Sequence, residues 1–286
     1  MASGNMKAIK RRIKSVGSTM QITKAMELVA SSKLRKAKEK AEAGRPYFEK
    51  LYEMMTEIAE SKKDFDSPFT KKREVENRLF IVIAGDRGLA GGFNSSILKM
   101  ALADAEEGKN KPKIIAIGKK SIEFFAKRGF ELVGEYPLLA ETAKTADCAD
   151  IATLAIEMFK RGEVDEVKIF YTTFVSPLVQ NPISMDILPI YKDDAAGDED
   201  STLITYDPSP EAVFNRIVPK FTMSLIYCAL SDSYASEQSA RRNAMENATD
   251  NAEKMTEELS LKYNRARQEK ITNEINEIVS GANALQ

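Results

Sequence analysis

The chain has 286 residues, 43% of them hydrophobic and 30% charged, which fits one large or two modest folded domains and excludes a fully disordered protein. It contains no histidine, which excludes Ser-His-Asp or Cys-His catalysis and histidine-ligated metal sites. The net charge is only −1, and because no run of about 18 uncharged apolar residues is present, we expect no transmembrane helix.

Residues 7–43 predict one long amphipathic helix, because they contain no proline and only one glycine, Gly17. Apolar or small residues recur at steps of three and four, close to the seven-residue repeat of a coiled coil. They are Ile9, Ile13, Val16, Met20, Thr23, Met26, Ala30, Leu34, Ala37 and Ala41. The Gly44-Arg45-Pro46 segment could interrupt this helix. We assign residues 1–60 to an N-terminal long helix.

This first helix is strongly basic. Residues 1–45 contain twelve Lys or Arg and three Glu, so they carry a net charge of +9, and an acidic cluster at 193–200 belongs to the oppositely charged remainder. The basic face is either solvated or a surface for an acidic partner or nucleic acid. No aromatic residue lies between Lys7 and Lys40, so the stacking platform of single-strand binders is missing. The opening lacks the apolar segment of a secretory signal, and we interpret it as mature protein.

Residues 76–192 predict a central Rossmann-like α/β domain. Apolar segments predict strands at 77–84, 113–117, 130–134, 167–174 and 183–190, and helices at 94–107, 119–128 and 145–161. Strands that alternate with helices indicate a mostly parallel sheet covered by helices. The two cysteines, Cys148 and Cys228, have no metal-binding spacing, so we expect buried thiols in a reducing compartment.

A glycine-rich loop, residues 85–92, follows the first predicted strand. Its glycines are Gly85, Gly88, Gly91 and Gly92. A phosphate-binding turn has this position, but the loop matches neither G-x-G-x-x-G nor the P-loop pattern that ends in GK[ST]. We therefore favour a structural turn, with a doubly wound nucleotide-binding enzyme with helical arms as the alternative. We predict no catalytic residue, cofactor or metal.

Residues 209–286 predict a second long helix. Ser209, Pro210 and Glu211 form a typical helix start, and Pro219 should kink or restart the helix. Residues 220–280 contain no glycine or proline, so a continuous helix would be about 90 Å long at ~1.5 Å per residue. Such a helix must project from the domain or pair with another helix. We expect an antiparallel coiled coil with the N-terminal helix.

The seam of this second helix is rich in small residues. It runs through Met245, Ala248, Ala252, Met255, Leu259, Tyr263 and Ala266, slips by one residue, and resumes at Ile271, Ile275, Ile278, Ala282 and Leu285. Small residues bury roughly half the area of a leucine seam, which suggests that other chains surround the pair. The N-terminal helix is too short to cover the last turns, so we expect other subunits to bury them in an apolar collar.

Three groups of motifs occur in order along the chain. The first is ITKAMELVA at 22–30 with SKLR at 32–35, and the second is GDRGLAGGFN at 85–94. The third comprises ASEQSAR at 235–241, NATDNA at 247–252, YNRARQ at 263–268, IT at 271–272 and EIVSGA at 277–282. The ordered set resembles the gamma subunits of F-type ATP synthases.

The resemblance implies a non-catalytic rotor subunit whose terminal helices form the central stalk. Its tip would sit in the apolar bearing of the alpha-beta hexamer, and its α/β domain would contact the epsilon subunit and the membrane c-ring. Rotation would then couple proton transport to ATP synthesis or hydrolysis. The chain looks bacterial, which places it peripherally at the cytoplasmic face of the cell membrane, without direct membrane insertion.

The resemblance also implies roles for individual residues. Contacts with the catalytic beta subunits would map onto Lys24, Met26, Arg241, Gln268 and Thr272, and the bearing tip onto Ile271, Ile275, Ile278 and Leu285. A coiled-coil scaffold or nucleic-acid-binding protein is a further alternative, which the acidic remainder of the chain and the lack of aromatic residues in the basic helix oppose.

Overall fold

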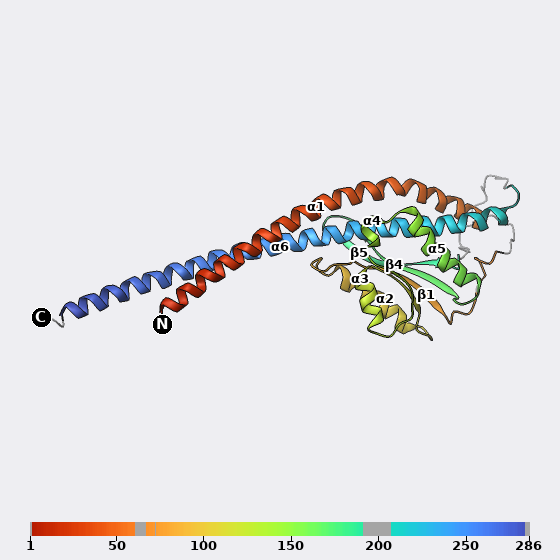
Figure 1. Ribbon diagram of the computed structural model, residues 1–286. Coiled ribbons are helices and arrows are strands. Elements are labelled where there is room, and N and C mark those ends of the chain that lie inside the picture. The colour runs from red at the N-terminus through yellow and green to blue at the C-terminus, as the bar shows by residue number, and fades with distance from the viewer. Residues whose placement is uncertain (1, 61–66, 72, 191–206, 284–286) are drawn as a thin grey trace. The chain divides into compact units, whose positions relative to one another are not determined.

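Figure 1 shows the computed structural model, which describes residues 2–60, 67–71, 73–190 and 207–283. The chain divides into two compact units, one formed by Met1–Ala30 with Arg241–Gln286 and the other by Ser31–Ala240. Two long helices, α1 (Ala2–Glu60) and α6 (Pro210–Asn283), contribute residues to both units.

A five-stranded sheet forms the centre of the unit Ser31–Ala240. Its strands are β1 (Arg78–Ile83), β2 (Lys113–Ile117), β3 (Leu132–Tyr136), β4 (Glu166–Phe174) and β5 (Gln180–Leu188). They lie in the order β3-β2-β1-β4-β5, and all pair in parallel except β5, which is antiparallel to β4. Every residue of β1 is buried, as expected for the central strand of a parallel sheet that is covered on both faces. The predicted mostly parallel sheet is thus confirmed.

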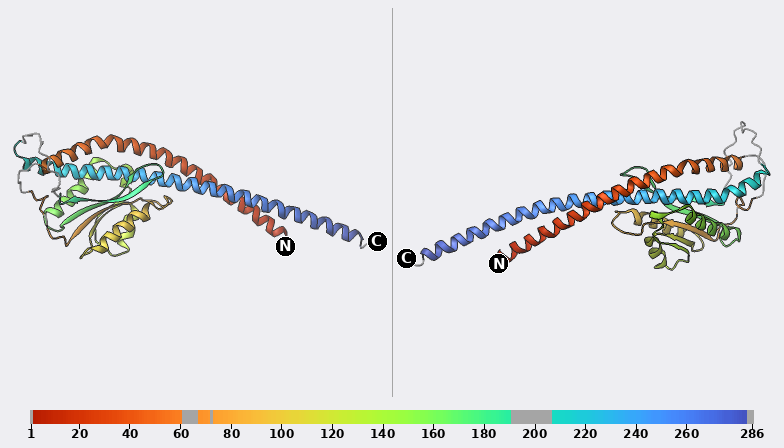
Figure 2. Two further views of the ribbon diagram at one scale, coloured as in Figure 1. Left: turned by 180° about the vertical axis from the view of Figure 1, so that it is seen from behind. Right: turned by 45° about the horizontal axis from the view of Figure 1, so that its top comes forward.

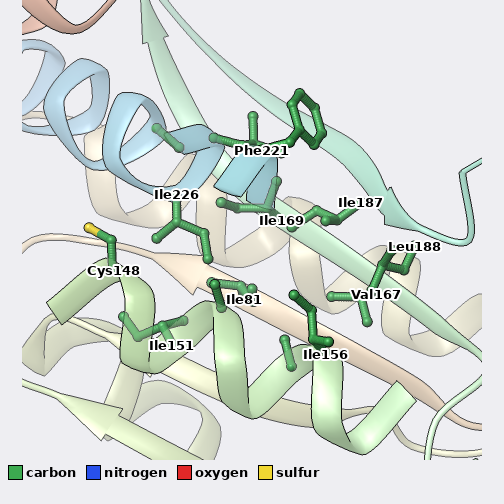
Figure 3. Close-up of a cluster of buried hydrophobic side chains, with 14 of the residues drawn as sticks. Ile81, Cys148, Ile151, Ile156, Val167, Ile169, Ile187, Leu188, Phe221 and Ile226 are labelled. Atoms are coloured by element: carbon green, nitrogen blue, oxygen red, sulfur yellow. The ribbon is translucent and has the colours of Figure 1, made fainter. Parts of the chain in front are cut away.

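Helices cover both faces of this sheet (Figure 2). Successive β1 side chains point to opposite faces: Phe80 and Val82 pack with α2 (Phe93–Glu107) and α3 (Lys119–Ala126), whereas Ile81 and Ile83 belong to the core on the other face. That second core contains α5 (Thr145–Lys160), the short α4 (Leu139–Thr142) and parts of α1 and α6. Figure 3 shows Phe221 and Ile226 of α6 meeting the sheet in this core.

Neither internal proline breaks its helix, so the interruption expected at Gly44-Arg45-Pro46 and the restart expected at Pro219 were wrong. A proline inside a helix costs about 3 kcal/mol. Each buried aliphatic or aromatic side chain contributes ~1.5–3 kcal/mol, and several flank each proline. They are Leu51, Met55 and Ile58 on α1, and Phe214, Ile217, Val218, Phe221 and Leu225 on α6. Core packing therefore outweighs the local cost.

Two strand boundaries differ from the sequence expectation. β3 begins at Leu132 rather than residue 130, because Phe130 closes the preceding helix: its amide donates to the Phe125 carbonyl across Gly129, which has φ +68°. β5 covers Gln180–Leu188 rather than 183–190, because its polar start pairs with the end of β4 at Phe174. Helix α4 was not predicted.

The other unit is an antiparallel pair made by residues 2–30 of α1 and 241–283 of α6. The Thr23 and Thr249 hydroxyl oxygens lie 2.8 Å apart and set its register. Every α1 residue expected in this part of the seam is buried or half-buried. On α6 the seam differs from the expectation at Met255, which is 41% exposed, while Thr249 and Thr256 are half-buried.

The α6 seam is therefore a regular heptad pattern that uses threonine. It runs through Met245, Thr249, Ala252, Thr256, Leu259, Tyr263 and Ala266, in alternating steps of four and three. The hydroxyls of Thr249 and Thr256 donate to the carbonyls of Met245 and Ala252 in their own helix. Because the polar atoms are satisfied in this way, both side chains fit an apolar seam.

Candidate functional site

The loop after β1 is held by side chains of its neighbours at the carboxyl edge of the sheet. The Gly85 amide donates to Asn94 Oδ1 over 2.7 Å. Asp86 Oδ1 accepts from the Lys119 amide at 3.0 Å and the Leu138 amide at 2.8 Å. Asp86 therefore joins the segments that follow β1, β2 and β3. No pattern in the sequence indicated this role of Asp86.

The four loop glycines have different structural roles. A methyl group on Gly85 would lie 2.9 Å from the Glu237 carboxyl group, and Gly91 has φ +55°, so both positions favour glycine. Gly88 and Gly92 have ordinary φ values, and a methyl group there would meet at most a serine hydroxyl at van der Waals distance. Leu89 takes a left-handed conformation, φ +61°, without being glycine.

The loop is poorly suited to hold a phosphate. The amides of Gly85 and Phe93, at the loop and at the start of α2, already donate within the chain. The carboxyl groups of Asp86 and Glu237 add negative charge beside them. Within the described residues, no group of three or more Cys, Asp or Glu side chains is placed to hold a metal ion.

Lysines of α1 attach that helix to the segment around α4. Lys33 Nζ lies 2.5 Å from Glu141 Oε1, and this hydrogen bond lowers the pKa of Glu141. Lys40 Nζ donates to the Ala143 carbonyl at 2.7 Å, and partial burial lowers the pKa of its ammonium group. The Lys38 ammonium lies 5.2 Å from the centre of the Phe174 ring. Part of the basic charge on α1 thus serves contacts inside the chain.

The residues expected to contact catalytic subunits do not form one cluster. Lys24 is exposed, with Nζ 3.0 Å from Glu27, and Met26 is half-buried in the seam. On α6, Arg241 is half-buried, whereas Gln268 and Thr272 are exposed and share a helix face. Arg241 and Gln268 are 27 residues apart, about 40 Å along the helix. Such a set suits a long interface rather than a single pocket.

The end of α6 exposes an apolar stripe. Ile271, Ile275 and Ile278 are 44%, 53% and 72% exposed, whereas Leu285 lies outside the described residues and so does the side chain of Ala282. The Thr23–Thr249 contact explains this exposure. Because the two helices run antiparallel, Ala2, where α1 begins, lies opposite residue 270: both are 21 residues from the Thr23–Thr249 contact. The stripe therefore starts where the cover from α1 ends.

Two further features of this unit escaped the sequence analysis. Ile22, Leu28 and Val29 are more than half exposed on the outer side of α1. A shallow groove also lies between α1 and α6, with an apolar floor and a mostly basic rim. It is lined by Ala8, Ile9, Arg12, Leu259, Lys262, Arg265, Ala266 and Glu269. None of the described helices is long and apolar enough to span a membrane.

Comparison with known proteins gives matches along nearly the whole chain. The ATP synthase family profile matches residues 5–285. A protein of Ruminococcus albus called ATP synthase gamma chain is 52% identical over 281 residues, covering 97% of this chain and 98% of that protein. One from Acetobacterium woodii, called ATP synthase gamma chain, sodium ion specific, is 41% identical over 299 residues, covering 98% and 99%.

Solved structures share the fold. A chain in the OSCP/F1/c-ring of the Euglena gracilis mitochondrial ATP synthase aligns with a TM-score of 0.71 and 22% identity, covering 99% of this chain and 95% of that one. A chain in the central stalk/c-ring structure of the Tetrahymena thermophila enzyme gives a TM-score of 0.62 at 24% identity, covering 79% and 99%. At these identities the likeness concerns the fold alone.

Proposed function

The chain belongs to the family of ATP synthase gamma chains, and we propose that it is the rotating central-stalk subunit that couples ion flow through the membrane ring to ATP synthesis or hydrolysis. As a member of this family it is a subunit of an ATP synthase complex. The observation that carries the proposal is the end-to-end match of both long helices and the α/β domain to gamma chains.

In this proposal, the coiled-coil unit lies inside the ring of alpha and beta subunits. The exposed stripe of Ile271, Ile275 and Ile278, continued by Leu285, is the tip that an apolar collar surrounds. Lys24, Met26, Arg241, Gln268 and Thr272 contact beta subunits along the shaft. Two facts support this placement: the outer apolar side chains are exposed in the part of the chain that the structure describes, and the proposed contact residues are spread along the helices.

The α/β domain is proposed as the foot of the rotor, in contact with the epsilon subunit and the c-ring. The chain itself would carry out no chemistry, bind no cofactor and no nucleic acid, and lie peripherally on the cytoplasmic face of a bacterial cell membrane. Internally bonded amides and two carboxyl groups at the loop of residues 85–92 support a structural rather than a nucleotide-binding loop.

Co-purification tests the proposal. An affinity-tagged chain, co-expressed with the alpha, beta and epsilon subunits of its own ATP synthase, should purify with alpha and beta in equal amounts and in excess over itself. The purified complex should hydrolyse ATP, and the chain alone should not. The proposal fails if alpha and beta assemble into hexamers under the same conditions while the tagged chain purifies alone.

A further inference from the structure

Strand β4 is longer than the neighbour that covers one of its edges. It pairs with β1 only from Glu166 to Phe170, while its pairing with β5 continues to Phe174. Beyond Phe170, the edge that faces away from β5 therefore lacks a strand partner. Thr172 lies on this edge and is buried, so its backbone groups need partners from elsewhere in the protein. A buried amide that is left unpaired destabilises the fold.

Helix α6 supplies these partners. The Thr172 amide donates to Ser233 Oγ at 3.0 Å, and Ser236 Oγ donates to the Thr172 carbonyl at 3.2 Å. Both serines are buried, and their spacing of three residues places them on one face of the helix. One turn further on, buried Ser239 Oγ donates to the Pro177 carbonyl at 2.8 Å, in the turn between β4 and β5. We call Ser233, Ser236 and Ser239 the serine clamp.

These three bonds differ from most contacts of α6 with the domain, although Asn215 and Asp232 of α6 also accept hydrogen bonds, from Ser67 and Thr173. The earlier part of α6 packs through apolar side chains such as Phe221 and Ile226, and hydrophobic contacts are non-directional. They hold the helix against the sheet, but they do not depend on the angles of particular bonds. Hydrogen bonds weaken steeply when their angles change. Three such bonds, on successive turns, fix the roll angle of α6.

The position of the clamp on α6 also matters. Ser239 is followed by Ala240, the last residue of this compact unit, and α6 continues without a break into Arg241 and the coiled-coil unit. Near this end α1 packs through Leu34 and Ala37 against Ala235, and its polar contacts are through lysines: Lys33 meets a half-exposed carboxylate. Exposed ion pairs contribute little to stability. The buried clamp is thus the better-defined connection between the sheet and a helix that leaves the domain.

We propose that the serine clamp is the joint through which the α/β domain turns α6, so that Ser233, Ser236 and Ser239 are positioning residues for energy coupling. The proposal rests on the proposed rotor function. A foot domain that is driven round the axis must rotate the helix with it. A helix that can roll against the sheet loses part of each turn, so ATP hydrolysis continues while fewer ions are moved per ATP.

The test uses the complete synthase in membrane vesicles and compares the Ser233→Ala/Ser236→Ala double variant with Ser231→Ala. Ser231 is a matched control, because it is buried on the same helix but its hydroxyl donates to the Tyr227 carbonyl of α6 itself. Ions pumped per ATP hydrolysed should fall at least twofold in the double variant and stay at the wild-type value in the control. Equal ratios in the two variants would overturn the proposal.

A second comparison keeps the proposal testable if the double variant assembles poorly. The Ser236→Ala single variant leaves only a carbonyl without its partner, and unsatisfied carbonyls are tolerated better than unsatisfied amides. It should also pump fewer ions per ATP than Ser231→Ala, and an equal ratio would again overturn the clamp. If the wild-type chain itself fails to assemble with alpha and beta subunits, the rotor function is what fails. If the wild-type chain couples normally and the clamp variants do so as well, the proposed role of the clamp fails while the rotor function stands.

Discussion

The hydroxyl oxygens of Thr23 on α1 and Thr249 on α6 lie 2.8 Å apart, and this contact determines how much of α6 is left without an intramolecular partner. Each hydroxyl oxygen also lies within hydrogen-bond distance of a carbonyl in its own helix. Thr23 Oγ1 is 3.0 Å from the Met20 carbonyl oxygen, and Thr249 Oγ1 is 2.9 Å from the Met245 carbonyl oxygen. These polar contacts therefore fix the register of the two helices, which apolar contacts alone would define less sharply. In this register the last turns of α6 extend past Ala2 and expose their isoleucines.

Charges placed on this exposed stripe should prevent assembly while leaving the chain folded. In the Ile275→Asp/Ile278→Asp variant both side chains are already exposed in the isolated protein, so circular dichroism should show an unchanged helix content. Within an apolar collar each carboxylate would cost several kcal/mol in desolvation. The yield of the complex with alpha and beta subunits should fall at least tenfold. Wild-type yield together with wild-type thermal stability of the complex would show that no apolar collar surrounds the tip.

Substitutions along the shaft should separate contact residues from solvated ones. Arg241→Ala and Gln268→Ala should each lower ATP-driven ion pumping severalfold, because we place both side chains against beta subunits. Lys254→Ala serves as the control, since its side chain is exposed and lies outside the groove between the helices, and a lone surface charge contributes little. Ion pumping and ATPase activity, measured on the same vesicles, test whether these two residues act in coupling. Equal losses in all three variants would remove the basis for this assignment.

Two of the four glycines in the loop after β1, Gly85 and Gly88, should respond differently to replacement by alanine. In Gly85→Ala the new Cβ would lie 2.9 Å from the Glu237 carboxyl group and 3.1 Å from Asn94 Oδ1, so we expect a loss of about 1–3 kcal/mol in unfolding free energy. In Gly88→Ala the Cβ would meet no atom within 4 Å, and the change should stay within about 0.5 kcal/mol. Urea unfolding of both variants tests this difference, which similar midpoints would contradict.

The two thiols should be unreactive in the folded chain. Burial raises the pKa of Cys148 to about 12 and that of Cys228 to about 11, from 9.0. At pH 8 both are therefore protonated, and iodoacetamide should alkylate them at least a hundredfold more slowly than in the denatured chain. Rapid labelling of the native protein at pH 8 would contradict the burial of these side chains.

The same pKa values give a direction for the pH dependence of stability. Below pH 9 the thiols are neutral in the folded and the unfolded chain, so their contribution is fully present. As the pH rises from about 9 towards 11–12, thiolates form first in the unfolded chain, and stability falls. The Cys148→Ala variant should lose less stability than wild type between pH 9 and pH 11 in thermal unfolding. Identical losses would contradict the assignment.

Much of the architecture was predictable, because periodicity reports burial directly. The α1 stripe from Ile9 to Ala41 is buried or half-buried at every expected position, and the apolar run of β1 forms the centre of the sheet. The prolines misled the analysis because local propensity says nothing about the core that holds Pro46 and Pro219 in their helices. The resemblance named contact residues along the shaft, and no local signal in the sequence would have found them.

The polar contacts were the part that the sequence did not reveal. Thr249 and Thr256 were not counted in the seam, because a hydroxyl looks polar until its bond to the preceding turn is seen. Asp86 and the serines at 233 and 236 form bonds with backbone groups of distant segments. Such long-range pairings depend on where the strands end, as at Phe170 in the β1–β4 ladder, and this requires the folded structure.

The most direct test of the account is to watch the α/β domain turn. A Lys109→Cys variant offers an exposed attachment point on this domain for a bead, while the buried Cys148 and the half-buried Cys228, both with raised thiol pKa values, stay unlabelled. The variant is assembled with alpha and beta subunits, and the hexamer is fixed to a surface through beta. The account predicts continuous rotation in one direction that requires ATP and stops when ATP is removed. A complex that hydrolyses ATP at the wild-type rate while the bead stays at a fixed angle would contradict the claim that this chain is the rotor.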